Sequence, residues 1–376
     1  MEKAVYDNLL KILKDELVPA TGCTEPIAVA YAAALARDTL GAIPDRVEVA
    51  VSGNILKNVK SVVVPNTGGL RGIQSAAAAG IVAGDATKKL DALSSVRTAD
   101  RAKIADYLKT ANFTVVKSQS GCVLDISVKV SLGSHTAAVR IAKHHTNVVY
   151  VEKDGKVLVD TGFSDDETVT RDATGLTVKN IVEFADTVKL SDVEPTLRRQ
   201  IECNMTISAE GLKNDYGARI GKTLLAAFGD SVQNRAKASA AAGSDARMNG
   251  CSLPVVIVSG SGNQGMTASI PVIIYAKELG ASDEKLLRAL VVSNLVTVRL
   301  KSGIGELSAY CGAVSAGCGA GAGVCYLRGG SYDAISQTVV NALAINSGVI
   351  CDGAKSSCAA KIASAVDAGL IGLEMC

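Results

Sequence analysis

The sequence contains no tryptophan, only four phenylalanines and no CxxC pair. Side chains that stack on nucleic-acid bases are therefore scarce, and the 39 Lys and Arg residues are matched by 37 Asp and Glu residues without a dense basic block. Both features argue against nucleic-acid binding. Because zinc sites usually draw their four ligands from CxxC pairs, the missing pair argues against zinc.

The N-terminal segment, MEKAVYDNLLKILKDEL, lacks the long apolar core of a secretory signal and has the spacing of an amphipathic helix. The sequence nevertheless contains ten cysteines. In a reducing compartment such thiols stay free for metal binding, catalysis or packing. We therefore expect a cytoplasmic protein without a disulfide framework.

Charge is missing from two long stretches, residues 249–276 and 308–327. Each is long enough to cross a bilayer. Both are rich in Gly, Ser and Ala, however, and SGSGNQG interrupts the first. Strong apolar spans and interfacial Trp are also missing. The pattern favours buried helices of a soluble protein over a membrane transporter, and we expect no membrane contact.

The periodicity of the remaining chain predicts alternating helices and strands in its first half. Residues 2–18 and the alanine-rich segment after GCTEP favour helices, and the latter is expected to stop at Gly41. RVEVAVSG and SVVVP favour strands. Residues 112–159 favour several strands, with a hairpin turn at Asp154-Gly155.

Helical periodicity dominates from about Thr177 to the end of the chain. The length also suggests two domains. We therefore predict the α+β class, with an α/β domain over residues 1–175 that contains a mixed or antiparallel sheet. An all-α, small-residue-rich catalytic domain is expected over residues 176–376, after a link near 160–180.

Cys23 directly precedes a predicted helix in the loop PATGCTEP. Thr24 or Glu25 can cap that helix, and Pro26 suits its first turn. The positive end of the helix dipole would favour a thiolate over a thiol at this position. Cys23 is thus a candidate base, nucleophile or metal ligand, and the alternative is a buried cysteine that only packs.

Cys351 and Cys358 lie on either side of a predicted helix start in the stretch GVICDGAKSSCAAKIASAV. Asp352 can cap a helix that begins at Ala354, and Gly353 can provide the turn. Both thiols can then face one point near the positive helix end. Cysteine is the usual ligand of iron–sulfur clusters. A cluster with three cysteine ligands and one open iron would suit Lewis-acid catalysis.

The upstream cysteines Cys311, Cys318 and Cys325 are spaced by seven residues and share one helical face. The simplest interpretation from the spacing is a packing stripe in a Gly/Ala helix.

Residues 259–265 form a second candidate site, because an apolar run enters them and a small-residue helix leaves them. Backbone N–H groups and hydroxyls in such a loop can bind a carboxylate or phosphate. The loop has neither the GK[ST] ending of a Walker A motif nor a GxGxxG pattern. Carboxylate capture and a plain interhelical loop remain the two interpretations. The candidate substrate-binding residues are Ser259, Ser261, Gly262, Asn263, Gln264 and Gly265.

Further polar residues lie after the first predicted strand. Asn54, Lys57 and Asn58 are predicted to form a turn there and are candidates for orienting a ligand, although a solvated face also explains Lys57. His144 and His145 are predicted within a strand, which allows only one of them to point inward.

Several quoted segments together resemble the L-cysteine desulfidase family, which is related to the α chain of iron–sulfur L-serine dehydratases. They are GCTEPIAVAYAAA, SGNILKNV, VPNTGGLRGI, HTNVV, SGSGNQG, SGIGELSAYCGAVSAGCGAGAG and CDGAKSSCAAKIASAV. The resemblance covers nearly the whole chain. Members of this family usually continue for several dozen residues beyond the last segment, whereas this sequence has eighteen residues after Cys358.

The resemblance implies a [4Fe-4S] cluster whose ligand motif falls on Cys311, Cys351 and Cys358. It also implies that Cys23 acts as the catalytic base. The relatives break down small amino acids without pyridoxal phosphate, and L-cysteine yields hydrogen sulfide, ammonia and pyruvate. The expected partner is therefore a small amino-acid substrate, and homo-oligomerisation is left open.

The predicted function is accordingly an iron–sulfur-dependent L-cysteine desulfidase. One alternative is a dehydratase of L-serine or a related β-hydroxy amino acid. Another, of a different class, is a non-catalytic protein that binds amino acids or senses redox state on the same fold.

Overall fold

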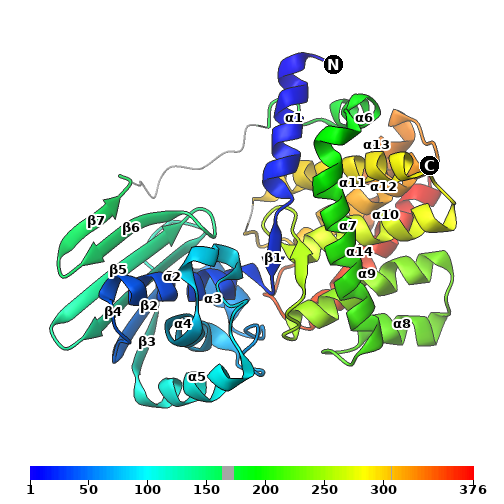
Figure 1. Cartoon of the computed structure of the whole chain (residues 1–376). Coiled ribbons are helices and arrows are strands. Elements are labelled where there is room, and N and C mark those ends of the chain that lie inside the picture. The colour runs from blue at the N-terminus through cyan, green and yellow to red at the C-terminus, as the bar shows by residue number, and fades with distance from the viewer. Residues whose placement is uncertain (163–172, 306) are drawn as a thin grey trace.

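The computed structural model describes residues 1–162, 173–305 and 307–376, which form a sheet half and a helical half (Figure 1). The sheet half contains six strands in the order β3-β2-β4-β5-β6-β7. The β2–β3 pair is parallel and the other neighbours are antiparallel. The strands are β2 (Arg46–Val51), β3 (Asn112–Lys117), β4 (Asp125–Leu132), β5 (His135–Ala142), β6 (Val148–Lys153) and β7 (Lys156–Asp160). The mixed sheet and the α+β class are as predicted.

One face of this sheet is covered by helices. Helix α2 (Thr24–Leu40) packs across β4 and β5, and α4 (Gly72–Ala83) packs on α2. Alternate residues of β2, Val47, Val49 and Val51, are fully buried beneath them. The sheet half also contains α3 (Gly53–Val59), the 3₁₀ helix η1 (Ala86–Asp91) and α5 (Thr98–Thr110).

The helical half is built around α12 (Gly312–Leu327), which contacts α10, α11, α13 and α14. Glycine and alanine dominate α12, so its neighbours approach its backbone closely. The other helices of this half are α6 (Val178–Thr187), α7 (Leu190–Lys213), α8 (Ile220–Phe228), α9 (Val232–Met248), α10 (Gly262–Glu278), α11 (Asp283–Ile304), α13 (Tyr332–Ile345) and α14 (Ser357–Glu374).

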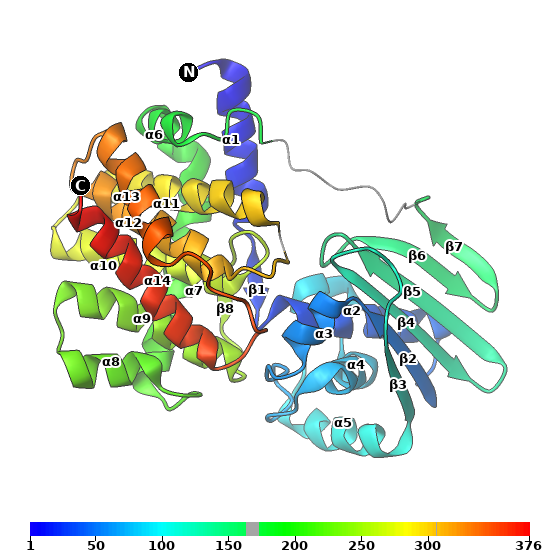
Figure 2. The same ribbon diagram turned by 180° about the vertical axis from the view of Figure 1, so that it is seen from behind.

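The first 21 residues pack with the helical half, although the chain then enters the sheet half (Figure 2). Helix α1 (Lys3–Glu16) contacts α6, α7 and α11, and Leu9 and Leu13 join the core of that half. Strand β1 (Pro19–Thr21) pairs with β8 (Pro254–Val256). Residues 1–21 belong to the first predicted domain in sequence, residues 1–175, but they pack with helices of the second, residues 176–376.

Three local predictions differ from the structure. SVVVP forms no strand but a single bridge, Val63 to Arg71, and Val62 is buried against Cys23 rather than in a sheet. NILKNV lies within helix α3 rather than a turn. His144 and His145 lie in the turn between β5 and β6, because the strand stops at Ala142. The predicted link near residues 160–180 lies partly outside the described residues.

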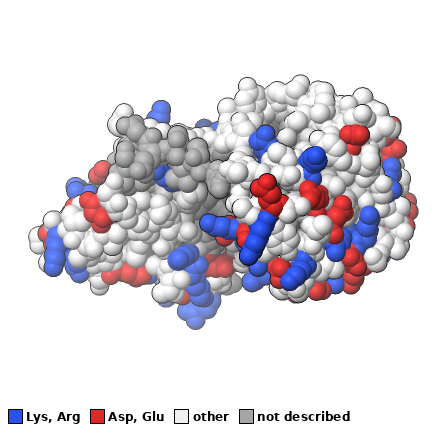
Figure 3. Space-filling view, turned by 90° about the horizontal axis from the view of Figure 1, so that it is seen from above, with Lys and Arg blue, Asp and Glu red and all other residues white. Residues whose placement is uncertain are grey.

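Neither uncharged stretch forms a membrane-length helix. Residues 249–276 contain β8, a turn and α10, and residues 308–327 contribute the 16-residue α12, which is roughly 24 Å long. None of the helices among the described residues is both long and apolar enough to cross a membrane. Acidic and basic side chains are interspersed on the face shown in Figure 3.

Candidate functional site

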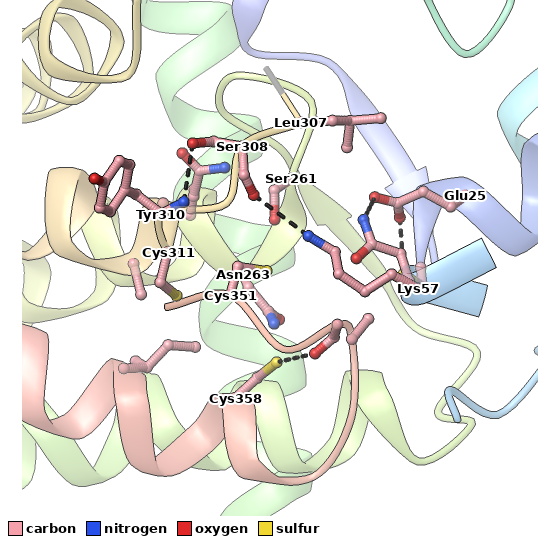
Figure 4. Close-up of a pocket in the computed structure, with 18 of the residues that line it drawn as sticks. Glu25, Lys57, Ser261, Asn263, Leu307, Ser308, Tyr310, Cys311, Cys351 and Cys358 are labelled. Atoms are coloured by element: carbon pink, nitrogen blue, oxygen red, sulfur yellow. Dashed lines mark hydrogen bonds between the residues drawn. The ribbon is translucent and has the colours of Figure 1, made fainter. Parts of the chain in front are cut away.

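A cavity of about 100 Å³ lies where the sheet half meets the helical half. Nine of the predicted site residues line it: Cys23, Lys57, Asn58, Ser261, Asn263, Gln264, Cys311, Cys351 and Cys358. Figure 4 shows the last three, which lie on the side of the pocket away from Glu25 and Lys57. The structure therefore brings together residues that are up to 335 positions apart in the sequence.

Four helices begin at this cavity. Cys23 is the N-cap of α2, Ser261 of α10 and Cys311 of α12, and Cys358 is the second residue of α14. The positive ends of these helix dipoles thus converge on one space. Such an arrangement favours anionic groups, whether thiolates or the carboxylate of a ligand.

Cys311 and Cys351 are held together by a short antiparallel bridge between residues 310 and 350. The N–H of Cys311 donates to the carbonyl of Val349 at 2.9 Å, and the N–H of Cys351 donates to the carbonyl of Ala309 at 2.8 Å. Because side chains alternate along extended backbone, the two thiols lie on one side of the bridge, toward the cavity, and Tyr310 and Ile350 lie on the other, although Tyr310 also lines the cavity. Tyr310 and Ile350 are accordingly 54% and 58% exposed.

Cys358 reaches the cavity from the first turn of α14, which begins at Ser357 and not at the predicted Ala354. Asp352 does not cap this helix, because its carboxylate pairs with Lys355 and Lys361. Gly353 provides the predicted turn, with φ of 96°. A Cβ at Gly353 would lie 2.4 Å from the carbonyl oxygen of Lys57, so this close approach requires glycine.

The electrostatics of the three thiols reflect their burial and mutual proximity. Burial, with a smaller contribution from the neighbouring Cys311 and Cys351, raises the pKa of Cys358 to about 11. Burial also raises the pKa of Cys311, whereas the N–H of Ala313 and the charge of Lys361 lower it. Without a metal Cys311 and Cys358 are therefore neutral thiols, and iron would displace their protons.

Among the described residues, no three His, Cys, Asp or Glu side chains are grouped tightly enough to hold one metal ion. In an iron–sulfur cluster, however, each cysteine binds a different iron atom, so the thiols need not converge on one ion. Three thiols on one cavity wall, beside the positive ends of helices α12 and α14, match that donor set. The residues present therefore fit a cluster better than a single ion.

Cys23 is paired with an acidic group that the sequence analysis treated only as a helix cap. Its thiol donates a hydrogen bond to Oε2 of Glu25 at 3.0 Å. Burial and the negative charge of Glu25 raise the pKa of Cys23 well above its usual value, against the opposing charge of Arg247. The predicted thiolate is thus not the resting form, because desolvation outweighs the helix dipole at this 2% exposed site.

Glu25 itself is a buried but ionised carboxylate. Besides Cys23, its oxygens accept hydrogen bonds from Thr24 Oγ1 at 3.0 Å and Asn58 Nδ2 at 2.9 Å. Burial raises the pKa of Glu25, but the charge of His145, the hydrogen bonds from Cys23 and from its own backbone N–H, and the charge of Arg247 together outweigh burial and lower it. Glu25 is therefore an ionised hydrogen-bond acceptor that favours the protonated form of Cys23.

The predicted loop 259–265 is divided between a turn and the start of α10. Ser261, Asn263 and Gln264 line the cavity. Ser259 faces a separate hollow, where its N–H donates to Glu16 Oε2 at 2.7 Å. Gly262 and Gly265 do not line the cavity but allow close packing, since a Cβ at Gly265 would lie 2.0 Å from the carbonyl oxygen of Val256.

Asn54 is not among the residues that line the cavity. It is the second residue of α3, whereas Lys57 and Asn58 lie a turn later and reach the cavity. Lys57 also contacts the helical half, because its Nζ donates to the carbonyl of Ser308 at 3.3 Å.

Sequence reasoning missed Glu25, Arg247 and Lys301, all of which line the cavity. One signal was available for Arg247: it and Asp245 are the two charged residues in the otherwise small and apolar segment ASAAAGSDARM. A charge in such a segment is expected to be buried for a reason. Nothing comparable marks Lys301, which is found only from the fold.

The sequence of this chain is similar to those of known proteins over most of its length. The family model described as serine dehydratase alpha chain matches residues 87–376. A UPF0597 protein of Desulfitobacterium hafniense (strain Y51) is 54% identical over 371 residues, which cover 98% of this chain and 86% of the relative. A UPF0597 protein of Lachnoclostridium phytofermentans is 53% identical over 367 residues, covering 98% and 88%. One from Treponema denticola is 45% identical over 383 residues, covering 100% and 89%.

Proposed function

Because this chain belongs to the serine dehydratase alpha-chain family, we propose that it is an iron–sulfur-dependent lyase acting on a small α-amino acid. The proposed reaction is β-elimination without pyridoxal phosphate. L-cysteine is the proposed substrate, with hydrogen sulfide, ammonia and pyruvate as products. The observation that supports this proposal is that Cys23, Cys311, Cys351 and Cys358 line one cavity.

In this proposal Cys311, Cys351 and Cys358 hold a [4Fe-4S] cluster. A cluster with one iron open to the substrate would act as a Lewis acid on the β-substituent. Lys361 lies close enough for its charge to act on Cys311 and Cys358, and it offsets part of the negative charge of the thiolates. Both the helix ends and this lysine therefore stabilise an anionic donor set.

The base of the reaction is Cys23. Its thiol donates a hydrogen bond to Oε2 of Glu25, so Cys23 has to release this proton to solvent before its thiolate can remove the α-proton of the substrate. Asn58 holds the other oxygen of Glu25 and so fixes the orientation of the acceptor. The interior position of Cys23 keeps bulk water from competing with it for the α-proton.

L-serine is the second candidate substrate, and the described function of the matched family favours it. The two candidates differ only in the atom on the β-carbon. The small cavity volume suits either.

The proposal can be tested on protein purified without oxygen. Iron and sulfide are quantified, and pyruvate formation is measured with L-cysteine and L-serine. Cys351→Ala is expected to lose iron, because one of three ligands is gone. Cys318→Ala is the matched control: Cys318 is a buried cysteine within α12 that does not line the cavity, so iron content should be unchanged.

Cys23→Ala separates the base from the cluster. We expect this variant to keep its iron and visible spectrum but to lose pyruvate formation by about 100-fold or more. Full activity of Cys23→Ala would refute the base, and unchanged iron in Cys351→Ala would refute the ligand set. Bound iron without pyruvate from either substrate would favour a binding or redox-sensing protein instead.

A further inference from the structure

Arg247 is a cavity residue to which the proposed reaction assigns no role. It lies at the penultimate position of α9, is 2% exposed and lines the cavity. Its Nη1 donates to Oδ1 of Asn263 at 3.2 Å. Its Nε and Nη2 are buried and have no hydrogen-bond partner among the described residues.

A buried guanidinium with two unsatisfied nitrogens is unusual in a folded protein, because buried cations are normally paired. The local packing is nevertheless specific. A Cβ at Gly262 would lie 2.5 Å from Nε, so glycine at this position leaves the room that the guanidinium occupies. Asn263, in the first turn of α10, holds Nη1 from the cavity wall.

Two other cations line the cavity, but each is already bonded to the backbone. Lys57 Nζ donates to the carbonyl of Ser308, and Lys301 Nζ donates to the carbonyl of Gly305. Arg247 therefore differs from both lysines, because its planar guanidinium can donate two parallel hydrogen bonds to one carboxylate. The N-terminus of α10 beside it favours the same negative charge.

The cavity also contains an unsatisfied acceptor. Asn58 donates Nδ2 to the Glu25 carboxylate, which fixes the orientation of its amide and leaves Oδ1 buried without a partner among the described residues. A cationic donor group and a neutral acceptor thus line the same small space. This pair is complementary to the carboxylate and the ammonium group of an α-amino acid.

We propose that Arg247 binds the α-carboxylate of the amino-acid ligand and that Asn58 Oδ1 accepts a hydrogen bond from its ammonium group. This assignment rests on the proposed function for its ligand class and goes beyond it by naming the group that selects for a free carboxylate. Amines and amides of the same size are then poor ligands, because neither offers a negative charge to Arg247.

Binding of unreactive ligands tests the assignment independently of turnover. L-alanine carries both charged groups but no leaving group, L-alaninamide lacks the negative charge, and propionate lacks the ammonium group. Dissociation constants are measured by titration calorimetry on the iron-loaded protein without oxygen. We expect L-alanine to bind about 100-fold more tightly than L-alaninamide, because a buried charge pair is lost with the amide. Propionate should also bind more weakly than L-alanine.

The variant Arg247→Gln should abolish the preference for L-alanine over L-alaninamide. Arg235→Gln is the matched control, because Arg235 lies on the same helix but pairs with Glu278 on the outside. Circular dichroism and iron content establish that the variants are folded. If Arg247→Gln does not fold, Arg247→Lys, which keeps the charge but not the fork, should lose part of the preference.

Failure of this assignment can be told apart from failure of the proposed function. An Arg247→Gln protein that still prefers L-alanine overturns the assignment, even if the wild type produces pyruvate. Equal binding of L-alanine and L-alaninamide by the wild type, or no binding of L-alanine, also overturns it. Conversely, if the preference for L-alanine depends on Arg247 but no substrate yields pyruvate, the assignment is supported and the proposed lyase activity is ruled out.

A purely electrostatic role of Arg247 on Cys23 gives a different result. In that case Arg247→Gln leaves the dissociation constant of L-alanine unchanged and alters only the pH dependence of Cys23 alkylation. That outcome also overturns the assignment.

Discussion

Two charged residues are buried in α9, and their surroundings give them different tasks. Arg247 faces the cavity, whereas Asp245 faces the start of α8. Oδ2 of Asp245 accepts a hydrogen bond from the N–H of Gly221 at 3.2 Å, and Oδ1 has no partner among the described residues. Burial therefore dominates and raises the pKa of Asp245 to about 6.

This raised pKa predicts a pH dependence of stability. An acid whose folded-state pKa lies above its unfolded value binds its proton more tightly when folded, so stability decreases as pH rises from about 4 to about 6. Asp245→Asn has no such proton. The difference in unfolding free energy, variant minus wild type, should increase by about 2–3 kcal/mol between pH 4 and pH 7. Denaturant titrations at both pH values measure it, and a difference independent of pH would contradict the assignment.

At the scale of the element, the functional residues depend on how closely the helices pack. Helix α12 crosses α14 through small residues. A Cβ at Gly317 would lie 2.2 Å from the carbonyl oxygen of Ala365, and one at Gly321 would lie 2.5 Å from that of Gly369. Since Cys311 begins α12 and Cys358 begins α14, this crossing sets the position of the two thiols relative to each other.

Gly317→Ala is therefore expected to destabilise the protein by about 3 kcal/mol, because the added methyl group forces two helix backbones apart. Gly303→Ala in α11 is the control. Nothing lies within 4 Å of a Cβ at Gly303, so the helix gains propensity of up to about 1 kcal/mol. Thermal unfolding of the two variants should shift in opposite directions. Equal shifts of the unfolding temperature would show that the close α12–α14 contact does not limit the size of the residue at position 317.

At the scale of the whole molecule, the cavity lies between two hydrophobic cores. One core lies within the sheet half and the other within the helical half together with α1. Polar contacts join the halves beside the cavity: Thr24 Oγ1 donates to the carbonyl of Gly260 at 3.1 Å, and Lys57 Nζ to that of Ser308 at 3.3 Å. The fold is thus stabilised mainly by apolar packing away from the thiols.

Removing the iron of the proposed cluster should consequently leave the fold intact. Hydrogen exchange followed by mass spectrometry, on iron-loaded and iron-free protein, should show lost protection in residues 307–313 and 349–358, which contain the proposed ligands and their bridge. Strands β2–β6 and helices α7 and α11 should exchange at the same rate in both forms, because Ala313 is the one residue of these segments that the buried cores of the two halves include among the described residues. Protection lost throughout the chain would contradict this expectation.

Much of the fold was predictable because it depends on local pattern. The α+β class, helix α1, the end of α2 at Gly41 and the Asp154-Gly155 turn follow from periodicity and turn chemistry. The prediction of a strand at SVVVP was wrong, because an apolar run does not show which part of the protein will bury it. Here Val62 is buried between the sheet half and the helical half. Asn54 was assigned to the site together with Lys57 and Asn58, but it lies one helical turn before them in α3, and only the later pair lines the cavity.

By itself, the sequence determined which residues have the chemistry for a site: the cysteines near predicted helix starts and the polar groups of a small-residue loop. It also determined which helices are rich enough in small residues to pack closely. Periodicity and capping are local properties, so they are encoded in short segments. The tertiary structure decided which of these residues share a cavity, that Glu25 keeps Cys23 protonated and that Arg247 has unsatisfied donors. Those outcomes depend on burial and on charges from distant segments, and neither is defined until the chain has folded.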